Sequence, residues 1–138
     1  MALEHCGMPP MLMRGVEPVA LLREFMGQAD GLCGGKGGHM HLFAPDKLAA
    51  SSGIVSAAGP AANGFVLAGQ MLHPGSVSIA FFGDGATSEG MLMESMNLAV
   101  VWKLSVIFVC KDNAWAITTP ANTVVGGNLL ARAQAFGM

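Results

Sequence analysis

The chain has 138 residues, of which 52% are hydrophobic and 12% charged, and it contains 19 glycines and no tyrosine. Soluble domains usually carry roughly 25% charged residues and about 7% glycine, so the charge is about half and the glycine about twice the usual share. Such an apolar composition excludes a disordered protein, and the length suits one domain. A formal net charge of −2 gives no electrostatic reason to expect nucleic acid or an anionic membrane as a partner.

The first half of the chain predicts two helices separated by glycine-rich loops. Residues 1–15 are rich in Met and Pro and show no clear period. Residues 18–26 have Pro at a first helical position and an apolar face, and a glycine ends the helix. A loop dense in glycine, residues 31–38, and a short apolar step at residues 53–55 come next. A second helix is expected over residues 60–71, where a His-Pro-Gly turn stops it.

Residues 48–83 contain no Asp, Glu, Lys or Arg. A transmembrane helix needs about 20 consecutive apolar residues. Pro60, Asn63 and Gln70 and the His-Pro-Gly turn interrupt this stretch. We therefore expect a deeply buried part of a soluble fold rather than a membrane span.

The three cysteines and the first residues of the sequence indicate the cellular compartment in which the protein is expected. Cys6, Cys33 and Cys110 are odd in number and lack metal-type spacing, which fits packed or surface thiols in a reducing compartment. No basic segment followed by an apolar one opens the sequence, so no secretory signal is expected. These features predict the cytoplasm or, in a eukaryote, the mitochondrial matrix.

The second half predicts a strand, a helix and a second strand. Residues 77–82 and 104–110 are apolar runs typical of buried strands. Thr87 or Ser88 is expected to cap the helix between them, which runs to about Trp102. Strands joined in this way should be parallel, with a right-handed crossover. Further along, Asn128 is expected to cap a last helix. The fold class is therefore α/β, a parallel sheet with flanking helices.

The middle helix is apolar around almost its whole circumference. Glu94, Ser95 and Asn97 are its polar exceptions. A helix of this kind must be covered on more than its sheet-facing side. In so short a chain, we expect another subunit to provide the additional cover.

Two polar side chains follow the ends of the two predicted strands. Asp84 comes just after the first strand and Asn113 just after the second. Ligands of parallel α/β sheets bind beyond the carboxyl ends of the strands. Carboxylate and amide oxygens suit Mg²⁺, which commonly completes its six ligands with phosphate and water. Gly85 and Ala86 lead toward a helix and could offer their amides to that phosphate.

Two other nucleotide motifs compete with this interpretation. The Gly-Asp-Gly turn begins like G-x-G-x-x-G, but Ser88 takes the place of the third glycine. Asp84 would repel a pyrophosphate without a metal, although Asp112 stands where a ribose-binding acid would. The glycines around Lys36 lack the following Ser or Thr of a P-loop, and Asp30 replaces its first glycine. The residues thus favour a metal-bound diphosphate and leave a dinucleotide as the alternative.

The order of these motifs resembles a known family. Gly83-Asp84-Gly85 followed by Lys111-Asp112-Asn113 resembles the thiamine-diphosphate motif. With residues 35–41, 52–55 and 82–120, the chain is similar to the alpha chain of thiamine-diphosphate-dependent 2-oxo acid and acetoin dehydrogenase components. The likeness covers about residues 13–138. It implies that residues 1–138 form a single, partial thiamine-diphosphate-binding domain.

The resemblance implies a set of metal and diphosphate contacts. Asp84, Asn113 and the backbone carbonyl of Trp115 would be Mg²⁺ ligands. Gly85 and Ala86 would contact the diphosphate through their backbone.

Further roles follow from the same resemblance. Gly53 and Val55 would hold the aminopyrimidine ring through main-chain groups. His41 is either a site-shaping residue or a hydrogen-bonded structural histidine. The glutamate that activates the aminopyrimidine belongs to the beta chain in this family. Glu89 and Glu94 are therefore expected to be solvated, capping or interface residues.

The family decarboxylates a 2-oxo acid, or cleaves acetoin, and passes the acyl group to a lipoyl group on a partner acyltransferase. The resemblance therefore implies a beta subunit as partner and a hetero-oligomer such as a heterotetramer. This chain departs from the family in its much shorter length, which removes a later histidine-bearing loop. Leu3-Glu4-His5 lies near the position of a Tyr-Arg pair without matching it. We therefore expect the chain alone to be inactive; the alternatives are a non-catalytic remnant that binds subunits and a dinucleotide-binding domain.

Overall fold

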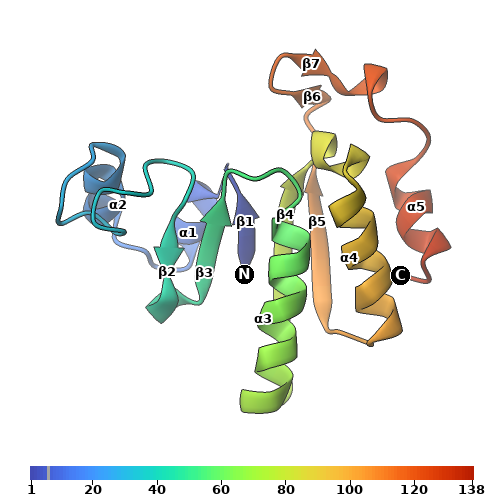
Figure 1. The fold of residues 1–138 in the computed structure, drawn as a ribbon, viewed down its shortest axis with the longest axis horizontal. Helices are drawn as coiled ribbons and strands as arrows, with labels where there is room; N and C mark the ends of the chain where they lie inside the picture. Colours follow the sequence, from blue (N-terminus) through green and yellow to red (C-terminus); the bar gives the residue numbers. More distant parts are fainter. Residues whose placement is uncertain (6) are drawn as a thin grey trace.

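The computed structural model describes residues 1–5 and 7–138, so Cys6 lies outside the described residues (Figure 1). The helices are α1 (Met8–Met13), α2 (Pro18–Phe25), α3 (Ala58–Leu72), α4 (Gly90–Val101) and α5 (Leu129–Ala135). The strands are β1 (Ala2–Glu4), β2 (Phe43–Ala44), β3 (Ala49–Ser52), β4 (Ser78–Gly83), β5 (Val106–Lys111), β6 (Trp115–Ala116) and β7 (Thr119–Pro120). The described residues also contain three short 3-10 helices, η1 (Pro45–Lys47), η2 (Asp84–Ser88) and η3 (Ala121–Thr123).

Five strands form one sheet in the order β2-β3-β1-β4-β5. All neighbours are parallel except β2, which runs antiparallel to β3. The predicted α/β class is therefore confirmed, as is the parallel pairing of the two strands in the second half. Because β1, β3, β4 and β5 run the same way, their carboxyl ends meet at one edge of the sheet (Figure 1). At that edge Gly83 pairs with Lys111.

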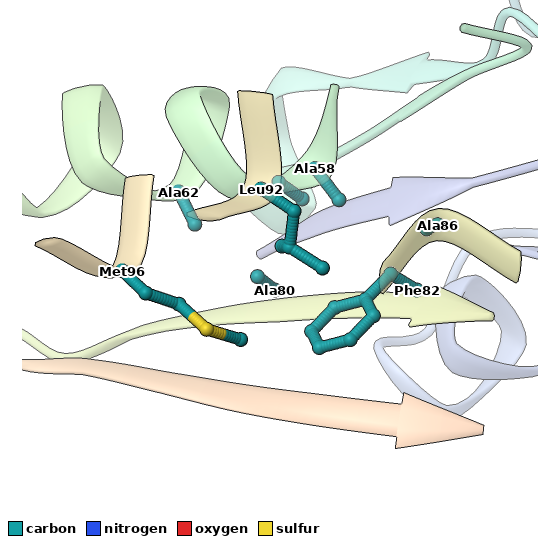
Figure 2. Close-up of a cluster of buried hydrophobic side chains, with 8 residues drawn as sticks. Ala58, Ala62, Ala80, Phe82, Ala86, Leu92 and Met96 are labelled. Atoms are coloured by element: carbon teal, nitrogen blue, oxygen red, sulfur yellow. The ribbon is translucent and has the colours of Figure 1, made fainter. Parts of the chain in front are cut away.

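The sheet buries one face against α3 and α4. Figure 2 shows Leu92 and Met96 of α4 reaching toward Ala80 and Phe82 of β4. Alanines dominate the rest of this cluster, and their small side chains allow α3 to approach the strands closely. Phe82 also meets Phe108 of β5 edge to face, with ring centroids 6.4 Å apart.

A second cluster forms on the opposite face, because successive side chains of a strand point to opposite sides. Leu3 follows the first-cluster residue Ala2 on β1 and is buried here. It packs with Met11 of α1 and Leu21 of α2. The aperiodic stretch at residues 1–15 thus contains a strand and a helix that the pattern did not predict. A three-residue strand is too short to show a period.

Several local predictions differ from the structure. The helix α4 begins at Gly90, and neither Thr87 nor Ser88 caps it. Both side chains have other partners, the carbonyls of Asp84 and Val124 respectively. Asn128, in contrast, does cap α5, accepting the N–H of Ala131 at 3.0 Å. That prediction is confirmed.

The uncharged stretch is only partly buried. Ala62 and Val66 of α3 lie in the interior, but the large side chains Phe65, Met71 and Leu72 are exposed. The expectation of deep burial throughout is therefore wrong for the outer face of α3. No helix within the described residues is both long and apolar enough to span a bilayer.

The cover on α4 also comes partly from this chain. The helix packs against α3, and Figure 1 places α5 along its other side. Met91, Val101 and Trp102 still expose their side chains. Apolar surface therefore remains on α4 after the chain has folded.

Candidate functional site

Asp84 is a buried acidic residue at the carboxyl edge of the sheet. The strand β4 ends at Gly83, and the chain turns at once into η2. Asp84 is 2% exposed, and its Oδ2 atom has no hydrogen-bond partner. The Thr87 hydroxyl donates to the Asp84 carbonyl at 2.5 Å, which holds the turn closed. A buried acceptor without a partner is costly, so this oxygen marks a position where an additional group would bind.

The turn after β5 lies beside this aspartate. Asn113 Oδ1 accepts the N–H of Trp115 at 3.0 Å and fixes the backbone between them. Ala114, between these two residues, adopts φ 63°, the left-handed region. The β6 strand then passes so close to η2 that a Cβ on Gly85 would lie 2.5 Å from the Ala116 Cβ. The fold thus brings together the two segments expected to hold the metal.

The donors in these two turns suit a hard divalent cation. Asp84 contributes a partnerless oxygen, and Asn113 Oδ1 keeps a second lone pair beside the one that accepts from Trp115. Such oxygens are the ligands that Mg²⁺ prefers. Among the described residues no group of three or more His, Cys, Asp or Glu side chains is placed to hold a metal. The metal ligands expected from the sequence include only one of these side-chain types, the carboxylate of Asp84. The other two expected ligands are the side-chain amide oxygen of Asn113 and the backbone carbonyl of Trp115.

Acidic groups lie near the thiol of Cys110 at this edge. Burial raises the pKa of Cys110 to about 11, and the carboxylates of Asp112, Asp84 and Glu4 add to the increase. Cys110 is a free thiol and remains protonated at neutral pH. The concentration of negative charge here favours a cation.

The segment at residues 53–55 follows β3 at the same edge. The Ile54 N–H is donated to Ser52 Oγ at 3.1 Å, while the side chains of Ile54 and Val55 are exposed. A Cβ on Gly53 would lie 3.3 Å from His41 Nε2, so His41 adjoins this segment. The structure therefore places His41 beside Gly53, at the end of β3, and Val55 follows two residues after Gly53.

Glu4 is a residue of this edge that the sequence patterns did not single out. It ends the central strand β1, is 5% exposed, and its two oxygens accept different backbone N–H groups. Oε1 accepts from Ser56 at 2.7 Å and Oε2 from Gly83 at 3.2 Å. Burial raises the pKa of Glu4, and the two backbone donors oppose that increase. A carboxylate among apolar residues at the end of a central strand is the signal that could have revealed it.

Glu24 is the second acidic residue that the patterns missed. It is 0% exposed and accepts the N–H groups of Cys33, Gly35 and Gly37 at 2.6, 2.9 and 2.6 Å. Burial raises its pKa, but these backbone donors outweigh that effect and hold the pKa below its usual value. The glycine-rich loop thus wraps a carboxylate, rather than forming a phosphate loop. A glutamate on the apolar face of α2 was the available signal.

The chain is an α/β protein, with a mostly parallel sheet flanked by helices. Polar groups gather beyond the carboxyl edge of the sheet, where proteins of this class bind their ligands. Comparison of the sequence with known protein families identifies which α/β family this is. Residues 1–138 match the family described as "Dehydrogenase E1 component". The chain belongs to that family.

Individual relatives agree with this assignment. The alpha subunit of acetoin:2,6-dichlorophenolindophenol oxidoreductase from Cupriavidus necator is 40% identical over 140 residues, covering 99% of this chain and 42% of the relative. The pyruvate dehydrogenase E1 component subunit alpha of Zymomonas mobilis is 37% identical over 93% of this chain and 37% of the relative. The mitochondrial counterpart from Kluyveromyces lactis is 41% identical over 79% of this chain and 26% of its own length. The chain thus spans less than half the length of these relatives.

Proposed function

We propose that this chain is the Mg²⁺- and thiamine-diphosphate-binding part of an E1 alpha subunit, a single partial domain. The observation that carries the proposal is the partnerless Oδ2 of the buried Asp84, beside the turn that contains Asn113. Family membership supports the same cofactor. The donor chemistry of the two turns supports a hard cation bridging to phosphate.

Each predicted site residue has a task in this proposal. Asp84 and Asn113 supply side-chain oxygens to Mg²⁺, and Trp115 supplies its carbonyl. Gly85 and Ala86 offer backbone N–H groups to the diphosphate, where the close approach of Ala116 leaves no space for a side chain on Gly85.

The other half of the site lies after β3. Gly53 and Val55 orient the aminopyrimidine ring through main-chain groups, and His41 shapes the surface beside them. When bound, thiamine diphosphate supplies the carbon nucleophile that attacks a 2-oxo acid or acetoin. This chain's residues bind and orient the cofactor, and we assign no proton-transferring residue to it.

The proposal includes partners. The names of the relatives identify alpha subunits, so we propose a beta subunit that completes the active site in a hetero-oligomer. Met91 and Val101 on α4, Trp102 at its C-terminal end and Ile107 on β5 offer apolar surface for another chain or segment. A lipoyl-bearing acyltransferase would receive the acyl group. The proposed location is the cytoplasm, or the mitochondrial matrix in a eukaryote.

Thermal unfolding tests the cofactor assignment. The chain is heated with thiamine diphosphate and Mg²⁺ together, with each alone, and with NAD, and the series is repeated with a beta subunit present. A ligand at a hundred times its Kd adds about 2.7 kcal/mol of stability. We expect stabilisation only when cofactor and metal are both present. If the melting temperature does not shift in either series, the proposal is contradicted. A shift with NAD and no metal supports the dinucleotide alternative. Association with a beta subunit without cofactor supports the non-catalytic remnant.

A further inference from the structure

We propose that Glu4 is a positioning residue that fixes the distance between the two halves of the cofactor site. The inference rests on the proposed function and adds a role that the predicted ligand set does not contain. The metal half is the turn beginning at Asp84, and the ring half is the segment that ends at Val55. Glu4 touches the backbone next to each half and would touch neither cofactor nor metal.

The location of Glu4 follows from the sheet. The strand β1 lies between β3 and β4, so its carboxyl end faces the ends of both neighbours. Glu4 pairs with Ser52 on one side, and Leu3 pairs with Phe81 on the other. The side chain of Glu4 therefore lies between the two following turns and reaches both of them.

The two carboxylate oxygens are divided between the turns. Oε1 accepts the Ser56 N–H at 2.7 Å, one residue beyond Val55. Oε2 accepts the Gly83 N–H at 3.2 Å, one residue before Asp84. One planar group thus sets the separation of two backbone segments that are distant in sequence.

Ser56 strengthens this connection. Its hydroxyl donates to the Ala86 carbonyl at 2.9 Å, so Ser56 contacts Glu4 and the metal half at once. Ser56 is fully buried and adopts φ 70°, a region that non-glycine residues rarely occupy. Such backbone persists only where the surroundings enforce it, which is consistent with a conformation held by these two contacts.

Replacing the carboxylate by an amide separates the two contacts. Glutamine has one acceptor oxygen, and its NH₂ group would face a backbone N–H donor. Glu4→Gln therefore keeps the shape of the side chain and can hold one turn only. The free turn then shifts relative to the other, which affects a ligand that spans both halves more than one that contacts a single half.

Isothermal titration calorimetry measures this difference in the full chain. Mg²⁺ with thiamine diphosphate probes both halves, and Mg²⁺ with inorganic pyrophosphate probes the metal half alone. For Glu4→Gln we expect the first affinity to fall about tenfold or more and the second by less than about threefold. The control Glu94→Gln, an exposed glutamate on α4, should change neither.

Equal losses for the two ligands, or no loss for either, would overturn the positioning role. Should Glu4→Gln fail to fold, as judged by circular dichroism, Ser56→Ala is the second variant, since it removes only the contact to Ala86. The same unequal losses are expected from it, and equal ones refute the inference. A wild-type chain that binds neither ligand, both alone and with a beta subunit present, refutes the proposed function and this inference together. Wild-type binding with an unchanged Glu4→Gln variant refutes this inference alone.

Discussion

Asp84→Asn should make the chain more stable without a metal and remove its response to Mg²⁺. Asp84 is 2% exposed and its Oδ2 has no hydrogen-bond partner among the described residues, so the folded state includes a buried acceptor without a hydrogen bond. Leaving such a group unpaired costs about 1–3 kcal/mol, and more when it is charged. The amide keeps the shape and leaves a neutral polar group in place of a charged one, so the variant recovers the part of this cost that the charge adds. We therefore expect the metal-free variant to gain on the order of 1 kcal/mol.

The corresponding change in melting temperature follows from the chain length. An unfolding entropy of about 2.1 cal/mol/K per residue converts each kcal/mol into a Tm shift of about 3–4 °C for a chain of this size. Differential scanning calorimetry, with and without Mg²⁺ and thiamine diphosphate, measures both effects. Asp112→Asn is the matched control, because Asp112 is exposed and its hydrogen bond from the Ala114 N–H needs only an oxygen that Asn retains. A metal-free Asp84→Asn variant less stable than wild type, or one still stabilised by Mg²⁺, would refute the reasoning.

Three further substitutions test the surroundings of the site. Gly85→Ala places a Cβ 2.5 Å from that of Ala116, so we expect a loss of about 1–3 kcal/mol from overpacking in urea unfolding; an unchanged midpoint would show that the two turns are not in contact. Glu24 has a lowered pKa, so its stabilisation is present above the usual glutamate value and disappears as pH falls through the folded value. Glu24→Gln should accordingly be less stable than wild type at neutral pH, and its melting temperature should change less as the pH is lowered. Curves of melting temperature against pH that run parallel for the variant and the wild type would contradict this. Asn128→Ala removes the cap of α5 and should cost about 1 kcal/mol in thermal unfolding, whereas Asn128→Ser, which keeps a capping oxygen, should cost less.

The strands and the helix of the second half could be predicted because their signals are local. An apolar run of six residues, a glycine turn and a longer apolar helix appear in the sequence in the order in which they fold. The boundaries moved by one or two residues, from residues 77–82 to Ser78–Gly83 for β4. The caps at Thr87 and Ser88 were wrong because both hydroxyls found acceptors in the folded chain, the Asp84 and Val124 carbonyls. A rule that considers only neighbouring residues cannot anticipate an acceptor such as the Val124 carbonyl, which is 36 residues away from Ser88 in the sequence.

The sequence by itself determined the α/β class and the motif order that leads to the family, since both depend on periodicity and spacing along the chain. It located the glycines and Asp84 that carry the cofactor hypothesis. Only the tertiary structure decided what the buried carboxylates do. Glu4 accepts hydrogen bonds from backbone donors 52 and 79 residues away, which the topology of the sheet brings within 3.2 Å. Glu24 accepts hydrogen bonds from donors 9 to 13 residues further along, in the loop that follows α2. Two of the few charged residues of this chain are thus buried glutamates, whose carboxylates accept hydrogen bonds from backbone N–H groups.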